Sequence, residues 1–271
     1  MDIFKTFVLG AVQGLTEFIP VSSSGHLELT QQIIGGRGAD FHMFLELINL
    51  GTFLALLIFF RKKIYQILVD IFENHNWKLA RNIIITSIPA GALGMVFAKL
   101  IEKASFFSSM VTIALAIGLV GIIMIFIEKI PTMEKIKGGG EKLTAGKALM
   151  IGIAQTLALI PGASRSGTTI IAGRIAGLDS KEAAEYSFLV SIPITLGICL
   201  KTVLSKSSLA YFGENWQMLL FSNLVAFVFG LWAVNFVMNF VKRKDSLKYF
   251  GIYRLVISIL ILTLIGTGVL G

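Results

Sequence analysis

Apolar segments long enough to cross a lipid bilayer recur along this chain, and they constrain its fold more than any other feature. Several run for about 20 residues with few charges, the length that a helix needs to cross the hydrocarbon core. Of the 271 residues, 55% are hydrophobic and only 15% are charged, against roughly 25% charged residues in a soluble domain. The alternating pattern of a membrane β-barrel is missing. The sequence therefore predicts an all-α integral membrane protein with a single membrane domain over residues 1–271.

The net charge of +8 is concentrated in a few connecting segments. Arginine and lysine gather around residues 61–81, 129–147 and 242–248, whereas the segments near 102–107 and 205–215 contain a single lysine each. Positively charged loops of membrane proteins lie on the cytoplasmic side. We therefore expect the three basic segments to be cytoplasmic, and we do not interpret the positive charge as a nucleic-acid surface.

Two pairs of helical segments are short and interrupted by a polar turn. The first pair covers residues 3–19 and 23–34 and breaks at Pro20, and the second covers 147–160 and 165–177 and breaks at PGASRSG. The other apolar segments are long enough to span the membrane, with boundaries good to about two to four residues. These spanning segments cover residues 41–60, 82–101, 108–128, 182–204, 216–241 and 248–269.

The two interrupted pairs are similar in sequence. GAVQGLTEFIPVSSSG (10–25) aligns without a gap with GIAQTLALIPGASRSG (152–167), and six of the sixteen positions are identical. This similarity predicts an internal repeat with halves of about 1–128 and 147–271, joined by a cytoplasmic loop at 129–146. Each half is then a re-entrant helical hairpin plus three transmembrane helices. Because three crossings reverse the orientation, we expect an inverted-topology repeat whose hairpins meet near the bilayer midplane.

A carboxylate lies in the first apolar segment, where a charge facing lipid would cost several kcal/mol. Glu17 follows Gln13 by four residues, so both side chains share one face of a helix. We therefore expect that face to contact protein or a water-filled cavity. Two interpretations stay open: Glu17 takes part in chemistry, or it only pairs with Arg165 to hold helices together.

Both polar turns carry residue types that begin helices and bind anions. Serines follow the helix-ending prolines, and serine is a preferred N-cap residue. Helix N-termini present free N–H groups and a partial positive charge, so two of them in one enclosed site would bind an anion such as phosphate. Arg165 adds a planar fork of donors that suits phosphate oxygens. The predicted substrate-binding residues are Gln13, Ser22, Ser24, Gly25, Ser164, Ser166, Gly167, Thr168, Thr169 and, as a residue lining the cavity, Glu46.

The same turns contain the catalytic candidates. Ser23 can attack phosphorus once a base takes its proton. His26 lies one helical turn further and can act as the base, as the acid for the leaving group, or as the nucleophile itself. Glu17 can activate Ser23, orient His26, or hold a divalent cation together with substrate phosphates. Arg165 would stabilise negative charge in the transition state. The residues alone leave the choice between Ser23 and His26 open, as well as the question of a metal site.

At these residues the chain resembles a known family. QGLTEFIPVSSSGH is similar to the (E/Q)xxxE motif and serine-rich loop of the bacterial undecaprenyl-diphosphate phosphatases, the BacA or bacitracin-resistance family. PGASRSG, completed by Thr169, resembles the second motif of that family, PGxSRSxxT. The resemblance implies a phosphatase of the bacterial plasma membrane that hydrolyses the terminal phosphate of undecaprenyl diphosphate. It further implies an active site open to the outer face and a product that is the carrier lipid of peptidoglycan synthesis.

The resemblance also carries expectations about individual residues and partners. The functional positions of the family fall on Glu17, Ser23, His26 and Arg165, with Gln13 at the first motif position. Many members have glutamate where this chain has Gln13, so a mechanism that needs two carboxylates is in question here. A divalent cation, Mg²⁺ or Ca²⁺, is usual in the family and would arrive with the substrate, and no organic cofactor is expected. The expected partners are the polyprenyl diphosphate lipid and the bilayer, with room for a homodimer.

A transporter is the main alternative, because inverted repeats with broken helices at the midplane are typical of secondary transporters. A transporter or flippase of a lipid phosphate or another anion would use the same architecture. The pairing of Ser23 and His26 beside Glu17 favours the enzyme, since transport requires no nucleophile. Arg254, within the last apolar segment, is interpreted as structural or interfacial.

Overall fold

The computed structural model describes residues 2–36, 39–103, 109–127, 129, 136 and 138–270. These residues form helices joined by turns and short loops, and none of them belongs to a strand. Within them, six helical segments are long and apolar enough to cross a membrane: Phe41–Phe59, Lys78–Val96, Met110–Ile127, Ser180–Leu204, Lys206–Phe240 and Ser246–Gly266. The predicted all-α architecture with several membrane-spanning helices is therefore confirmed.

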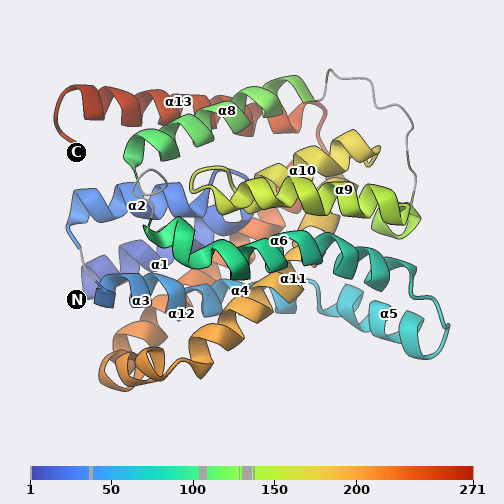
Figure 1. Ribbon diagram of the computed structural model, residues 1–271, viewed down its shortest axis with the longest axis horizontal. Helices are drawn as coiled ribbons and strands as arrows, with labels where there is room; N and C mark the ends of the chain where they lie inside the picture. The colour runs from blue at the N-terminus through green and yellow to red at the C-terminus, as the bar shows by residue number, and fades with distance from the viewer. Residues whose placement is uncertain are drawn as a thin grey trace.

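The two interrupted segments form helical hairpins. In the first, α1 (Ile3–Phe18) is followed by α2 (Ser23–Ile34), which has the predicted bounds. In the second, α9 (Ala145–Gln155) continues into the 3₁₀ turn η2 (Thr156–Leu159) and is followed by α10 (Arg165–Ala176). The hairpins extend from opposite ends of the bundle, and their turns face each other near its middle (Figure 1).

Long helices surround the hairpins (Figure 1). Helix α8 (Met110–Ile127) packs along α13 (Ser246–Gly266), and α12 (Lys206–Phe240) packs along α1. On the other side of the bundle, α6 (Lys78–Lys103) packs along α9, and α11 (Ser180–Leu204) contacts α10 and α6. Each hairpin is therefore held by spanning helices rather than by its own two helices alone.

Close packing of α1 on α12 depends on two glycines. A Cβ atom on Gly10 or Gly14 would lie 2.6 Å from a backbone carbonyl oxygen of α12, that of Ser222 or Ala226 respectively. Small residues let helix backbones approach closely in membrane proteins. The two glycines therefore bring α1, and with it the face that carries Glu17, against the centre of the bundle.

The segment predicted as one spanning helix at 41–60 is divided into α3 (Ala39–Leu47) and α4 (Asn49–Phe59). The Asn49 amide group donates to the carbonyl oxygens of Leu45 at 3.1 Å and Glu46 at 3.2 Å. A side chain that bonds to nearby backbone competes with the helical hydrogen bonds, which accounts for the break. Helix α5 (Arg61–Phe72), in the first basic segment, was not predicted.

The connection predicted near 205–215 is wrong, because α12 begins at Lys206. The backbone is non-helical only at Asn215 (φ −122°, ψ 16°), where two helices join. The turn at Gly139–Lys142 forms the 3₁₀ helix η1. Most of the other predicted connection, 102–107, lies outside the described residues.

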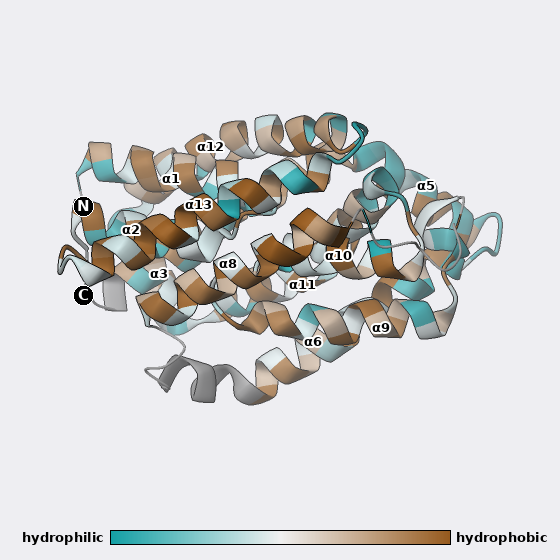
Figure 2. Cartoon of the chain, turned by 90° about the horizontal axis from the view of Figure 1, so that it is seen from above, coloured by the Kyte–Doolittle hydropathy of each residue, from teal (hydrophilic) through white to brown (hydrophobic). Residues whose placement is uncertain are grey.

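Hydrophilic residues concentrate at the end of the bundle that carries α5 (Figure 2). There the Asn76 amide donates to the Glu141 carboxylate at 3.0 Å, and the Asn82 amide donates to the carbonyl oxygens of Gly140 at 2.9 Å and Leu143 at 2.8 Å. These bonds join the end of the predicted basic segment 61–81 and the start of α6 to residues of the basic segment 129–147. Both chain termini lie at the opposite end (Figure 1).

Candidate active site

The two polar turns have the same local geometry. Ser22 (φ 80°, ψ 93°) precedes α2 and accepts the Gly25 N–H at 3.3 Å, and Ser164 (φ 73°, ψ 117°) precedes α10 and accepts the Gly167 N–H at 3.1 Å. In each turn the cap hydroxyl also lies 3.2 Å from the hydroxyl two residues further along. Of the serines predicted to cap these helices, Ser22 caps α2 and Ser164 caps α10. A positive φ is uncommon outside glycine, and such strained backbone clusters at functional sites.

The carboxylate of Glu17 joins the two turns. Its Oε2 accepts the Ser23 hydroxyl at 2.8 Å and the Gln13 amide at 3.2 Å. Its Oε1 accepts from Nη2 of Arg165 at 2.7 Å. Ser23 and Arg165 are the first residues of α2 and α10, so one carboxylate at the end of α1 contacts both helix N-termini.

Two residues that the sequence analysis did not identify hold this network in place. The Asn49 Oδ1, at the start of α4, accepts the Gln13 amide at 2.7 Å. The Thr195 hydroxyl of α11 accepts from Nη1 of Arg165 at 2.8 Å. Polar side chains within spanning helices commonly hydrogen-bond across helices. The polarity of Asn49 and Thr195 within apolar segments was the sequence signal for a special role, but it does not indicate which residues they bond to.

His26 bonds to groups outside the Glu17 network. Its Nδ1 is 2.8 Å from the Ser22 carbonyl oxygen, and its Nε2 is 2.9 Å from the Tyr253 hydroxyl. The two rings stack with centroids 5.8 Å apart and an interplanar angle of 8°. Both ring nitrogens are therefore occupied by groups other than Ser23, whose hydroxyl bonds to Glu17.

Arg254 fastens both turns to α8. Its side chain is completely buried. Nε donates to the Ile117 carbonyl and Nη1 to the Pro20 carbonyl, each at 3.0 Å, while Nη2 donates to the carbonyls of Gly162 at 2.8 Å and Ala163 at 3.1 Å. The role is structural, as predicted, but the position is not interfacial. An arginine inside an apolar span was a signal for a specific role.

The two turns also touch directly. The Gly162 N–H lies 3.4 Å from the Ser24 hydroxyl oxygen. Gly162 has φ 95°, and a Cβ atom there would lie 2.4 Å from the Ile113 carbonyl oxygen. Only glycine combines that backbone conformation with so close an approach.

Thr168, Thr169, Glu46 and Ser166 were also predicted as site residues, and their contacts are different. The Thr168 and Thr169 hydroxyls bond to backbone carbonyls of their own helix, and Thr169 also bonds to Ser187. Glu46 is exposed on α3, and its backbone carbonyl, not its carboxylate, contacts Asn49. Ser166 is buried at the start of α10.

The donor set offers little for a metal ion. Among the described residues, no three histidine, cysteine, aspartate or glutamate side chains lie close enough to hold one. Glu17 contributes the carboxylate of the network, and both of its oxygens are hydrogen-bonded. A divalent cation prefers several oxygen ligands, so the substrate would have to supply most of them.

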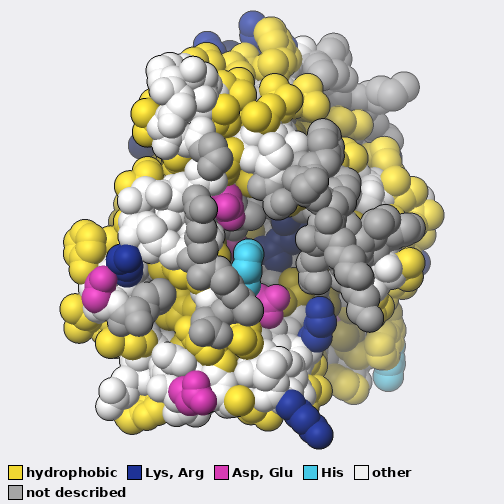
Figure 3. All heavy atoms as spheres, turned by 60° about the vertical axis from the view of Figure 1, so that its left-hand side comes forward, with side chains coloured by type: hydrophobic (Ala, Val, Ile, Leu, Met, Phe, Trp, Pro, Cys, Tyr) yellow, Lys and Arg dark blue, Asp and Glu magenta, His cyan; other side chains and the backbone are white. Residues whose placement is uncertain are grey.

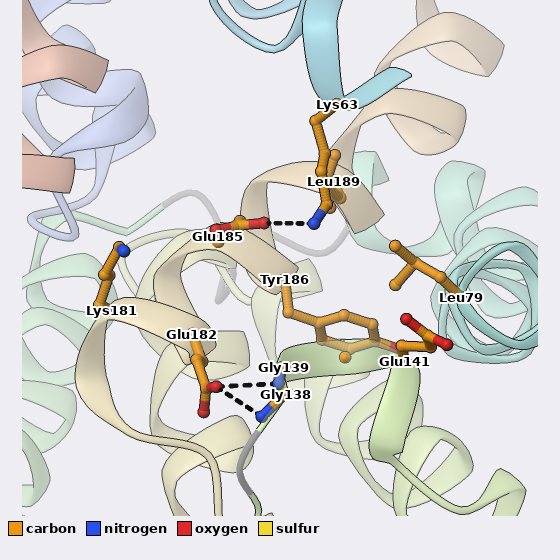
Figure 4. Close-up of a pocket in the computed structure, with 11 residues that line it drawn as sticks. Lys63, Leu79, Gly138, Gly139, Glu141, Lys181, Glu182, Glu185, Tyr186 and Leu189 are labelled. Atoms are coloured by element: carbon orange, nitrogen blue, oxygen red, sulfur yellow. Dashed lines mark hydrogen bonds and ion pairs between the residues drawn. The ribbon is translucent and has the colours of Figure 1, made fainter. Parts of the chain in front are cut away.

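Charged side chains and a cavity mark two further places on the surface. On the face seen in Figure 3, acidic, histidine and basic side chains lie close together near the middle. A cavity of about 230 Å³ lies between α5, α11 and η1 (Figure 4), where Lys63 pairs with Glu185 at 3.2 Å and Glu182 accepts the N–H groups of Gly138 and Gly139. None of the network residues lines this cavity.

Comparison with known proteins gives a consistent result over nearly the whole chain. The family model described as bacitracin resistance protein BacA matches residues 6–260. The undecaprenyl-diphosphatase of Wolinella succinogenes is 42% identical over 264 residues, covering 97% of this chain and 98% of that protein. Undecaprenyl-diphosphatase 1 of Clostridioides difficile is 39% identical, covering 97% of this chain and 96% of that protein. The undecaprenyl-diphosphatase of Aquifex aeolicus is 36% identical, with 96% and 97% covered.

Proposed function

We propose, from the premise that this chain belongs to the BacA family of bacitracin resistance proteins, that it is an undecaprenyl-diphosphatase. It hydrolyses the terminal phosphate of undecaprenyl diphosphate and so regenerates the monophosphate carrier lipid of peptidoglycan synthesis. The similarity to named undecaprenyl-diphosphatases over 96–97% of the chain supports the activity. The observation that carries the chemistry is the Glu17 carboxylate, which bonds both the Ser23 hydroxyl and the Arg165 guanidinium.

Ser23 is the nucleophile in the mechanism that this geometry favours. Its Oγ attacks the terminal phosphorus while Glu17 Oε2, 2.8 Å away, takes the hydroxyl proton. The new Oγ–P bond forms as the bond from phosphorus to the bridging oxygen breaks, and lipid monophosphate leaves with the electron pair. His26 is the weaker candidate because both of its ring nitrogens are engaged elsewhere.

Water completes the reaction. The proton held by Glu17 passes to solvent, and the carboxylate then takes a proton from a water molecule that attacks the phosphoserine. As the P–Oγ bond breaks, that proton passes to Ser23 Oγ, and inorganic phosphate leaves. Arg165 exchanges one of its partners for a phosphate oxygen, and with the N–H groups at the starts of α2 and α10 it stabilises the charge that develops.

The site lies near the bilayer midplane in this proposal. Its supporting residues come from the interior of spanning segments: Asn49 within Phe41–Phe59, Thr195 within Ser180–Leu204 and Arg254 within Ser246–Gly266. Irregular backbone at that depth is tolerated where it is buried or lines a cavity. The enclosed turns at Pro20 and Gly162 meet that condition.

The two hairpins are re-entrant elements of an inverted repeat in a single membrane domain. Their opposite entry into the bundle (Figure 1) and their matching N-caps support this topology. The hydrophilic end in Figure 2 contains the basic segments, so it faces the cytoplasm of the bacterial plasma membrane. The first hairpin then opens to the outer face, and so does the active site.

A divalent cation, Mg²⁺ or Ca²⁺, would be held by Glu17 together with the substrate diphosphate. Its positive charge would neutralise part of the negative charge on the phosphate oxygens. With the cation bound, Ser23, Glu17 and Arg165 would keep the roles given above, and the cation would add charge neutralisation that these residues do not supply.

Phosphate release from undecaprenyl diphosphate by the protein purified in detergent tests this function, with Arg165→Ala as the inactive reference. The transporter alternative predicts that reconstituted vesicles move a labelled lipid phosphate across the bilayer without releasing phosphate. Release by the wild type and its loss in Arg165→Ala are expected. Lipid movement without phosphate release would contradict the enzymatic function.

A further inference from the structure

The contact between His26 and Tyr253 belongs to no step of the proposed mechanism, although it lies one helical turn from Ser23. Tyr253 comes from α13, and its hydroxyl is 2.9 Å from His26 Nε2. The side chain is 43% exposed although it lies within the span Ser246–Gly266. A hydroxyl within the bilayer needs a hydrogen-bond partner, and His26 provides it.

The protonation of His26 follows from its partners. Nδ1 faces the Ser22 carbonyl oxygen, which can only accept a hydrogen bond, so Nδ1 carries a proton. In the neutral ring, Nε2 is then the acceptor for the Tyr253 hydroxyl. The pair therefore offers the Tyr253 O–H as one donor, and protonation of the ring gives Nε2 an N–H as another. Both are groups that bind phosphate oxygens.

The two polar clusters differ in how they face the bilayer. Glu17 and Arg165 are largely enclosed, with side chains 17% and 20% exposed. Around Tyr253, by contrast, Ile252 and Val256 of α13 are also exposed, at 42% and 57%. An isoprenoid diphosphate must keep its tail in contact with lipid, so the phosphate joined to the tail lies nearer this exposed apolar surface than the terminal phosphate does.

We propose that His26 and Tyr253 form the subsite for the lipid-linked phosphate, while Ser23 and Arg165 take the terminal phosphate. This inference rests on the proposed function. Residues three apart on a helix have Cβ atoms about 5–6 Å apart, a spacing that suits the two adjacent phosphates of a diphosphate. On binding, the Tyr253 hydroxyl exchanges His26 for a phosphate oxygen, and the stacked imidazole donates to another.

The two reaction products test the two subsites separately. Inorganic phosphate occupies the terminal subsite, and a short-chain isoprenyl monophosphate occupies the lipid-linked one. Their inhibition constants are measured against hydrolysis of a terminally radiolabelled isoprenyl diphosphate by the wild type, Tyr253→Phe and Tyr249→Phe. Tyr249 is the matched control, because it is exposed on α13 one turn earlier and is 60% exposed.

In Tyr253→Phe we expect the inhibition constant of the isoprenyl monophosphate to rise about fivefold to tenfold, because one hydrogen bond to the inhibitor is lost. The constant for inorganic phosphate stays at the wild-type value, and both constants stay there in Tyr249→Phe. Equal changes for both inhibitors, no change for either, or a wild type that the isoprenyl monophosphate does not inhibit would overturn the subsite. If Tyr253→Phe does not purify as a folded protein, His26→Gln removes the same pair from α2. A wild type that releases no phosphate would instead refute the proposed function.

Discussion

The carboxylate of Glu17 and the guanidinium of Arg165 lie 2.7 Å apart, although 148 residues separate them in sequence. The predicted pairing of Glu17 with Arg165 is therefore confirmed, and the part of Glu17 in the chemistry stays a prediction. Ser23 donates to the other oxygen of the carboxylate. A substrate phosphate that binds Arg165 would therefore lie next to Glu17, the proposed base.

Glu17→Gln keeps the shape of this side chain and removes its charge. We expect the rate of phosphate release to fall by about 10²–10⁴-fold because the general base is lost. Glu214→Gln, at an exposed position of α12, serves as the control and should retain the wild-type rate. Steady-state kinetics on both variants measure the effect, and a Glu17→Gln rate within threefold of the wild type would contradict the assignment of the base.

Ser23→Ala distinguishes the two nucleophile candidates. Loss of a nucleophile typically costs at least about a thousandfold in kcat, and we expect such a loss here. Ser24→Ala, which removes the 3.4 Å contact with the Gly162 N–H and the 3.2 Å contact with the Ser22 hydroxyl, should cost less than about tenfold. Rapid-quench trapping followed by mass spectrometry should find phosphate on Ser23 in the wild type. Phosphate on His26 would reverse the assignment.

Arg254→Met should separate the two turns. The substitution removes the arginine donor from four buried carbonyl groups, and a buried carbonyl left unsatisfied costs about 1–3 kcal/mol. We expect a lower midpoint of thermal unfolding and lost activity. Arg254→Lys should restore only part of both, because an ammonium group cannot reach carbonyls of Pro20, Ile117 and Gly162 in a fixed fork.

Arg243→Met is the matched control for this change. Arg243 is exposed at the turn after α12, where it lies over the Phe240 ring. Its loss should leave the unfolding midpoint nearly unchanged. Equal midpoints for Arg254→Met and Arg243→Met would show that Arg254 does not tie the turns together.

Gly162→Ala tests the close contact between the second turn and α8. A Cβ atom would lie 2.4 Å from the Ile113 carbonyl oxygen at a residue with φ 95°, and backbone strain of this kind costs about 1–3 kcal/mol. We expect reduced stability and reduced phosphate release. Gly146→Ala in α9, where a Cβ would meet nothing within 4 Å, should leave activity unchanged or raise stability slightly. The midpoint of thermal unfolding and the rate of phosphate release are measured for both variants, and equal values would contradict the close contact at Gly162.

Removal of divalent cations should lower activity without unfolding the protein. The described residues hold no ready-made metal cage, so the cation would be bound only together with substrate. We expect a chelator to abolish phosphate release, Mg²⁺ or Ca²⁺ to restore it, and the unfolding midpoint without substrate to stay constant. A midpoint that falls on chelation in the absence of substrate would indicate a resident structural site instead.

Local patterns in the sequence predicted much of the secondary structure. The lengths of the apolar segments and the helix-ending prolines defined both hairpins, and serine before a helix indicated the N-caps at Ser22 and Ser164. These signals act within a few residues, so they can be read without knowing the fold. The break before Asn49 was not predicted because it depends on a side chain that bonds to nearby backbone. The early start of α12 was not predicted because a second helix joins the apolar span at Asn215.

The composition and motifs by themselves determined the all-α membrane architecture, the two polar turns and the residue types of the site. Only the tertiary structure decided which groups meet: Glu17 with Arg165, Asn49 with Gln13, and Tyr253 with His26. A polar side chain in an apolar helix has the same local pattern whatever its partner. Its partner depends on how the helices pack, and that packing arises from contacts between segments far apart in the chain.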